Sequence, residues 1–567
     1  MNSGKKNDNL NLLKKKISRR SALSTVGKVA LSTVIAGVVA GVGGYYAGKS
    51  SAPTATATTT VTSTVGAKGT VTETVTKVKK VTETVTETAT ETVTKTVGAA
   101  PTKITTISDS ILSKYIRFYK DAVERDLGIK LEVIEALYGE LFEKISTDII
   151  SGANRFDLFL GPGDFIGTLA SQGWILPLDD FMQTYPYLDD YLPWIRNRVM
   201  KWGGHYYGLA FDGDCHILAY RKDLFRNPEY REMFKEKYNY ELPDPPKTID
   251  ELIDVAEFFN GWDWDGDGEP EYGIAFSAKR AGQTAWTIID FVAQYAVKPG
   301  PPSKYTGVLY FDPETMEPLT NTPGWIEGFK KWQEIVKHGP PGLPDFDVSD
   351  TRGLYMAGDV AIAIDWSDSG PLSISPDSKV KGKMAWAKLP GAPKYWDREK
   401  QKWVEEFNQI ALLNFGGWVW YVMKGVKEKD MENLVRIFLT YMTTSDKAAE
   451  MAVAHGETGV NIFRYSHLYS KNPDYWIKQG WDPESAENYC NTVMEVYESP
   501  NVVLDIRIPG FERYWDALDE AAANVASGTW GPEDACNWLY DEWSRITEEL
   551  GKDKQLKWYR QDLGLPV

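Results

Sequence analysis

The feature that most constrains the fold is an alternation of short β-branched runs with amphipathic stretches, which begins at Lys103. Residues 103–108, 129–136 and 156–160 have the composition of strands, and the last of them is apolar throughout. Residues 111–128 and 141–152 between them have helical spacing, and each ends in a glycine. Strand, helix, strand, helix, strand predicts an α/β fold with a parallel sheet and right-handed crossovers.

Such a sheet also indicates where a ligand would lie. Ligands of open α/β sheets bind outside the carboxyl ends of the strands. The residues that follow the three predicted strands are Ser108 and Asp109, Tyr138 and Gly139, and 161–164. We therefore expect Asp109 and Asp164 to face a binding site.

The first 50 residues have the layout of an export signal or membrane anchor. They carry a net charge of +8, and residues 29–47 form an uncharged, weakly apolar run. A cationic region before an apolar run is typical of a secretory signal, and its positive end would stay in the cytoplasm. Ser18, Arg19 and Arg20 also resemble a twin-arginine signal. Both cleavage and permanent anchoring remain open, and we slightly favour the uncleaved anchor.

Residues 51–103 are of low complexity, with 20 threonines and no aromatic residue. Such a segment cannot bury a core, so we expect a disordered, extended stalk of the kind found on O-glycosylated surface proteins. Valines recur at spacings of three and four between Val71 and Val85, which would also suit a weak helix or coiled coil. Threonine is a poor helix former, so the extended stalk is favoured.

Charge and composition exclude several classes of protein. The net charge is −16, and residues from 104 onward balance −26, which argues against a nucleic-acid partner. The three cysteines are far apart and the five histidines are scattered, so neither a disulfide framework nor a zinc site is indicated. The 21 tryptophans are unusual, and aromatic rings suit the apolar faces of sugars as well as a core.

Six segments, in order between about residues 104 and 550, carry a family resemblance. They are FDLFLGPGDFIGTLASQGWILPLDDF, YYGLAFDGDCHILAYRKDLF, PPKTIDELIDVAEFF, MAGDVAIAIDWSDSG, FGGWVWYVMKG and IPGFERYWDALDEAAANVASGTWGPEDACNWL. The chain resembles the extracellular solute-binding proteins of ABC transporters, in particular the carbohydrate-binding family that includes maltose-binding protein.

The resemblance implies a type II periplasmic-binding-protein-like fold, in which two α/β lobes are joined by a hinge and close on a ligand. The chain would cross between the lobes near 210–214, 415–418 and 456–459. The implied organisation is a signal or anchor over 1–50, a stalk over 51–103, lobe 1 over 104–211 plus 416–458, and lobe 2 over 212–415 plus 459–567.

The resemblance also implies candidate ligand contacts, which join the two acids predicted from strand ends. They are Asp214, Gln283, Trp286, Trp366, Trp418 and Trp515, beside Asp109 and Asp164. In the maltose-binding relative, the positions of Gly161 and Phe165 hold a ligand-contacting Trp and Arg. This departure makes maltose itself a doubtful ligand.

A separate motif lies in residues 263–271. Asp263, Asp265, Asp267, Gly268, Glu269 and Glu271 resemble the first part of an EF-hand loop, although Ile274 stands where a bidentate Glu is expected. A structural Ca²⁺ ion bound by Asp263, Asp265, Asp267, Glu269 and Glu271 is one hypothesis, and an acidic turn without an ion is the other.

The function expected from the resemblance is that of an exported, non-enzymatic receptor at the outer face of the membrane. It would act as a monomer with no required cofactor, bind a carbohydrate, and deliver it to ABC permease subunits; peptides and polyols remain open as ligands. The alternative is a secreted glycoside hydrolase, which needs two carboxylates roughly 5–10 Å apart. A structural surface-layer component is a third reading.

Overall fold

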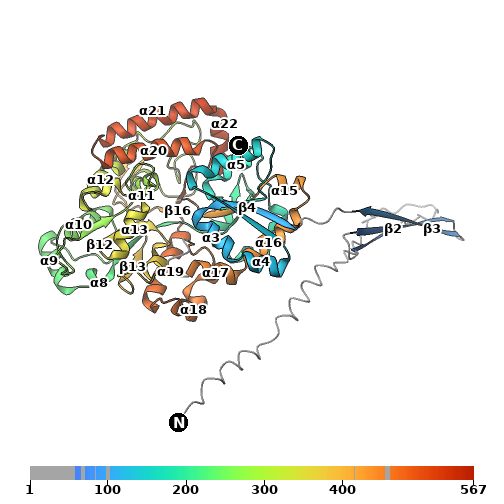
Figure 1. The fold of residues 1–567 in the computed structure, drawn as a ribbon. Coiled ribbons are helices and arrows are strands. Elements are labelled where there is room, and N and C mark those ends of the chain that lie inside the picture. The colour runs from blue at the N-terminus through green and yellow to red at the C-terminus, as the bar shows by residue number, and fades with distance from the viewer. Residues whose placement is uncertain (1–57, 66–69, 83–84, 97–101, 414, 454–459) are drawn as a thin grey trace, which may run out of the picture. The chain divides into compact units, whose positions relative to one another are not determined.

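A computed structural model describes residues 58–65, 70–82, 85–96, 102–413, 415–453 and 460–567 (Figure 1). The chain divides into two compact units, Met1–Thr102 and Lys103–Val567. The predicted signal or anchor over 1–50 lies outside the described residues. Within the described ranges, no helix has both the length and the apolar character that a membrane crossing requires.

The Thr-rich segment contains three strands, which differs from the disordered stalk expected from its composition. Strands β1 (Thr58–Val65), β2 (Thr70–Thr82) and β3 (Val85–Thr96) form an antiparallel sheet in that order. The reason is that threonine and valine are both β-branched and alternate with a period of two, which favours strands over helices. The function of this segment as a stalk stays a prediction.

The second unit begins with the predicted parallel sheet. Strands β4 (Lys103–Asp109), β5 (Lys130–Ala136) and β6 (Leu158–Pro162) are parallel neighbours, in the order β5-β4-β6. Two later strands extend this sheet: β17 (Trp418–Val422) pairs antiparallel with β6, and β9 (Gly208–Ala210) pairs antiparallel with β17. The predicted strands and their parallel pairing are therefore confirmed.

The helix predicted over 111–128 is two helices in the structure. Helix α3 (Ser110–Phe118) ends at Tyr119, where α4 (Lys120–Leu127) begins, and Gly128 closes α4 in the left-handed conformation as expected. Tyr119 is buried, and its hydroxyl donates to Glu450 at 2.8 Å, so a tertiary contact fixes the break. A sequence pattern does not contain that contact.

A second sheet lies in the part of the chain expected to form lobe 2. Its order is β11 (Tyr272–Ala275), β12 (Val360–Trp366), β10 (His216–Arg221) and β13 (Met384–Ala387). β11 runs parallel to β12, and the other pairs are antiparallel. The unit thus contains two mixed β-sheets, each with parallel and antiparallel strand pairs.

The chain passes between the two sheets where crossings were expected. It leaves β9 at Ala210 and enters β10 at His216, and it returns through 415–417 into β17. The third expected crossing, 456–459, falls outside the described residues. Just beyond it, the Asn461 backbone N–H donates to Asp212 Oδ1 at 2.5 Å and its side chain donates to Asp214 Oδ1 at 2.7 Å. Asn461 is therefore hydrogen-bonded to Asp212 and Asp214, in the segment that joins the two sheets.

Helices cover both sheets. Helix α10 (Ile249–Phe259) begins with a capping box formed by Thr248 and Glu251. Helices α20 (Phe511–Ala526) and α21 (Pro532–Leu550) lie side by side and pack on α11 (Thr284–Ala296) and α12 (Pro323–Ile335) (Figure 1). Around the first sheet are α5 (Leu141–Ile150), α6 (Ile166–Ser171), α7 (Asp179–Met182), α15 (Gly425–Glu428), α16 (Glu432–Met442) and α17 (Ser445–Val453).

The remaining elements belong to the second half of the unit or to small local sheets. The helices are α8 (Lys222–Phe225), α9 (Pro228–Tyr238), α10 (Ile249–Phe259), α11 (Thr284–Ala296), α12 (Pro323–Ile335), α13 (Val348–Ala357), α14 (Ser369–Ser373), α18 (Pro473–Lys478), α19 (Pro483–Tyr497), α20 (Phe511–Ala526), α21 (Pro532–Leu550) and α22 (Lys552–Leu563). The short strands are β7 (Lys201–Trp202), β8 (His205–Tyr206), β14 (Tyr395–Asp397), β15 (Lys402–Val404), β16 (Ala411–Leu413) and β18 (Val502–Leu504).

Candidate functional site

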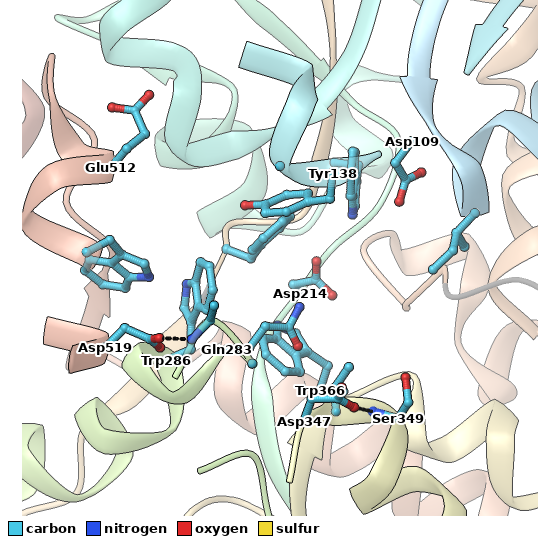
Figure 2. A pocket seen from close by; sticks show the side chains of 18 of the residues that line it. Asp109, Tyr138, Asp214, Gln283, Trp286, Asp347, Ser349, Trp366, Glu512 and Asp519 are labelled. Carbon is cyan, nitrogen blue, oxygen red and sulfur yellow. Dashed lines mark hydrogen bonds between the residues drawn. The ribbon is translucent and has the colours of Figure 1, made fainter. Parts of the chain in front are cut away.

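Residues at or just after strand ends of both sheets line a cavity of about 670 Å³ (Figure 2). This volume is in the range of roughly 300–1,000 Å³ that is usual for small-molecule sites. The first sheet contributes Asp109, at the end of β4, and Tyr138, just after β5. The second contributes Trp366, at the end of β12. The cavity thus lies at strand ends, as expected for this fold class.

Seven of the eight ligand contacts predicted from the sequence line this cavity. They are Asp109, Asp214, Gln283, Trp286, Trp366, Trp418 and Trp515. They come from segments up to about 400 residues apart in the chain, and the fold brings them together. Their contact with a ligand stays a prediction, because geometry alone places them.

The eighth residue, Asp164, is not part of the cavity lining. It lies in a 3₁₀ turn, Gly163–Phe165, where it is 1% exposed, and its neighbour Phe165 lines the cavity instead. Neither carboxylate oxygen of Asp164 has a hydrogen-bond partner. Burial, and the nearby acids Asp505 and Glu512, raise the pKa of Asp164 well above its ordinary value.

Aromatic rings form a continuous group along the cavity. The Trp286 ring lies 5.4 Å from Phe415, 5.5 Å from Trp515 and 6.3 Å from Trp366, measured between centroids. Phe415 in turn lies 5.6 Å from Trp418 and 5.6 Å from Tyr138. Rings at these separations pack against each other and present apolar faces and edges to a ligand.

Carboxylates complete the lining, and three of them accept hydrogen bonds from nearby donors. Asp109 caps α3 by accepting the Leu112 N–H at 2.8 Å, and Asp214 accepts from Asn461. Asp368 accepts from Arg352 at 2.6 Å. Burial raises the pKa of Asp109 and raises that of Asp368 to about 6, because desolvation disfavours the charged form.

The backbone is strained at three residues of the lining. Ala281, Gln283 and Phe415 have φ values of 58°, 78° and 69°, in the region that glycine favours. Non-glycine residues in this region cost energy and concentrate at ligand sites. Gln283 also keeps its side-chain oxygen buried without a partner. These observations mark the segment before α11 as one that is shaped for binding.

Sequence reasoning missed several lining residues, among them Phe415, Glu512, Asp519, Asp347, Arg352 and Asp368. Tyr138 follows a predicted strand, which indicates a place near the site, but it is not among the predicted ligand contacts. Phe511 and Glu512 start α20, in a segment whose family resemblance could have indicated them. Asp347 caps α13, and no pattern in the sequence connects it to the other lining residues.

The acidic loop of residues 263–271 lies outside the cavity. Asp263, Asp265, Asp267 and Glu271 offer carboxylate oxygens that all lie within 4.8 Å of one another. Glu269, which was also predicted as a ligand, is not part of this group. Glu271 is buried, and it accepts the Trp264 N–H at 2.7 Å. Four clustered carboxylates fit the oxygen ligands that Ca²⁺ prefers, but they are also compatible with an acidic turn.

If the loop holds calcium, Ca²⁺ is expected to raise the melting temperature of the chain, because the ion would neutralise the cluster and bind only the folded loop. Thermal melting with and without Ca²⁺ measures this rise, and titration calorimetry measures the binding of the ion, each on the wild type and on Asp265→Asn. Mg²⁺ is the matched control. Melting that is unchanged by Ca²⁺ and by chelator would leave the acidic turn as the correct reading.

The fold and the cavity define a two-lobed ligand-binding protein, and comparison with known proteins gives its family. The chain belongs to the bacterial extracellular solute-binding protein family, whose model matches residues 109–449. The predicted resemblance is thereby confirmed.

Individual relatives are more distant. A maltotriose-binding protein of Pyrococcus abyssi is 27% identical over 259 residues, which is 46% of each chain. A mannitol-binding protein of Pseudomonas aeruginosa is 26% identical over 298 residues, or 52% of this chain and 61% of that protein. The matches therefore span about half to three fifths of these curated relatives.

Solved structures share the fold at lower identity. A solute-binding protein of Agrobacterium radiobacter K84 in complex with ribitol is 19% identical, with a TM-score of 0.60, and covers 79% of this chain and 99% of its own. The maltose-bound MalE3 of T. maritima is 18% identical, with a TM-score of 0.59, and covers 78% and 99%. These likenesses support the type II two-lobed fold.

Proposed function

We propose that the chain is the substrate-binding receptor of an ABC importer and that it captures a sugar, an oligosaccharide or a sugar alcohol. The observation that carries the proposal is the cavity, to which both sheets contribute strand-end residues and the crossing segments contribute Phe415 and Trp418. A ligand there would contact both lobes at once, so its binding would favour their closed arrangement. The names of the relatives, which bind maltotriose and mannitol, agree with this ligand class.

The rest of the proposal concerns location and partners. The family and the basic N-terminal region support export. Anchoring through residues 29–47 would keep the receptor at the extracellular face of the cell membrane. The closed form would dock as a monomer on permease subunits, and another polypeptide would use ATP. We propose no catalysis, because the family and the named relatives are binding proteins. No specific observation favours the glycoside hydrolase.

A thermal-shift screen of the full chain tests this function. Sugars, oligosaccharides and sugar alcohols are tested separately, and at least one is expected to raise the melting temperature by several degrees. A ligand at one hundred times its Kd stabilises the folded state by about 2.7 kcal/mol. Calorimetry then measures the affinity, and chromatography of the recovered ligand checks that it is unchanged. Release of shorter saccharides would support the hydrolase instead, and a screen without any binder would reject the receptor.

A further inference from the structure

We propose that the ligand of this cavity carries a protonated amine, so that the receptor binds an amine-bearing sugar or sugar alcohol more tightly than the neutral counterpart. The inference rests on the proposed function and adds a charge requirement to it. It follows from three properties of the lining: the balance of charge, the acceptors that remain free, and the aromatic rings.

Carboxylates outnumber cations in the lining, although burial raises the pKa of several of them. Seven carboxylates line the cavity, and among the described residues that line it Arg352 is the one cationic side chain. Arg352 is already used, because it donates to Asp365 at 2.8 Å and to Asp368 at 2.6 Å. Both of these carboxylates are buried. An anionic sugar would therefore meet a negative potential with no free cation to offset it, whereas a cation would be attracted.

Acceptor atoms on opposite sides of the cavity remain available. Asp109 accepts the Leu112 N–H through Oδ1 at 2.8 Å, and the Ile111 N–H is a second backbone donor to this carboxylate, which leaves further lone pairs for a ligand. Glu512 Oε1 is buried, and no residue in the described part of the chain forms a hydrogen bond with it. Figure 2 shows the two carboxylates on either side of Tyr138. An ammonium group brings three N–H donors and a charge, whereas a hydroxyl brings one donor. Carboxylates that are short of donors therefore discriminate in favour of the amine.

The aromatic rings attract a cation as well as a sugar face. A cation near the face of Trp or Tyr is stabilised by the negative face of the ring. Trp286, Trp366, Trp418 and Tyr138 all line the same space. These rings would also stack on a neutral sugar, so the carboxylates rather than the rings set the preference.

Protonation gives the proposal a second readout. Burial raises the pKa of Glu512 to about 7 and that of Asp519 to about 6. A bound ammonium favours the ionised carboxylate and lowers these pKa values, so amine binding near pH 6.5 should release protons into the buffer. A neutral ligand brings no charge and should therefore release fewer protons.

The test uses pairs in which amines replace hydroxyls: glucosamine with glucose and 1-amino-1-deoxysorbitol with sorbitol, which differ by one amine, and chitobiose (the glucosamine dimer) with cellobiose, which differs by two. Calorimetry of the full chain at pH 6.5, in two buffers with different ionisation enthalpies, gives the affinity and the proton release. In each pair that binds, we expect the amine to bind at least about tenfold more tightly and to release protons. Glucuronic acid is expected not to bind.

Variants locate the effect. Glu512→Gln and Asp109→Asn each keep the shape of the side chain and remove a carboxyl that can ionise, and they should weaken the amine at least about fivefold more than the hydroxyl partner. Two variants are used so that one folding failure does not end the test. Glu232→Gln, at an exposed position on α9, is the matched control and should change neither affinity.

The outcomes separate the inference from the function on which it rests. If the hydroxyl members bind as tightly as the amines, the charge requirement is wrong while the sugar receptor stands. If neither the pairs nor any sugar of the thermal screen binds, both are rejected. If the amines bind more tightly and the two variants abolish the preference, the inference is supported.

Discussion

Replacing Trp286 by alanine is expected to weaken ligand binding by at least about 2 kcal/mol, or roughly thirtyfold. Trp286 is buried at the centre of the aromatic group, between the rings of Phe415, Trp515 and Trp366. Large aromatic residues at the centre of a desolvated site carry most of its binding energy. The affinity is measured by calorimetry with the ligand that the thermal screen identifies.

The same substitution is expected to lower the free energy of unfolding by about 3–5 kcal/mol, the usual cost of a buried Trp→Ala change. Part of this cost comes from Asp505, whose Oδ2 accepts the Trp286 indole N–H at 2.7 Å and would lose that donor. Stability is measured by urea unfolding. Affinity is compared only under conditions where both proteins are fully folded.

A matched control separates binding from stability. Trp332 is fully buried against Phe276 and Phe291, and its indole N–H donates to the Ala522 carbonyl at 3.0 Å, but it does not line the cavity. Trp332→Ala should lose similar stability and keep its affinity. If both variants lose affinity equally, Trp286 acts through the fold, and the cavity is not the binding site.

The parts of the fold that could be predicted from the sequence are those with a local physical signal. Short β-branched or apolar runs predicted β4, β5 and β6, and the rule that ligands lie beyond strand ends led to Asp109. Tertiary contacts decided what local patterns missed. The break at Tyr119 depends on Glu450, more than 300 residues away in the chain.

The cavity shows the same division between local and tertiary signals. Asp164 follows a strand as Asp109 does, yet the turn at Gly163–Phe165 directs Phe165 rather than Asp164 into the cavity. Glu512 and Asp519 come from the C-terminal helix α20, whose packing against α11 and α12 has no counterpart in a local pattern. The positions of strand ends therefore predict part of the cavity lining. The lining residues that come from helices can be found only in the structure.

Asp505→Asn is expected to remove a large pH dependence of stability. Asp505 is buried behind Trp286, its Oδ2 accepts the Trp286 indole N–H and the Phe415 N–H, and its Oδ1 has no partner. Burial raises the pKa of this carboxyl from 3.8 to about 7, and its two donors oppose the rise.

The sign follows from the protons bound in each state. Between about pH 4 and pH 7 the folded protein keeps the Asp505 proton that the unfolded chain has lost, so stability falls as pH rises through this window. At about 1.4 kcal/mol for each pH unit, the full cost above pH 7 is on the order of 4 kcal/mol. Asparagine carries no charge, and its oxygen can accept from the same two donors.

The variant should therefore be more stable than the wild type at pH 8, by up to about 4 kcal/mol, and the difference should shrink steadily toward pH 4. Urea unfolding at pH 4, 5, 6, 7 and 8 measures it, with Glu232→Gln as a control whose difference from the wild type stays flat. A variant that is less stable by the same amount at every pH would contradict the prediction. It would mean that Asp505 stays charged in the folded protein, held by the N–H groups of Trp286 and Phe415.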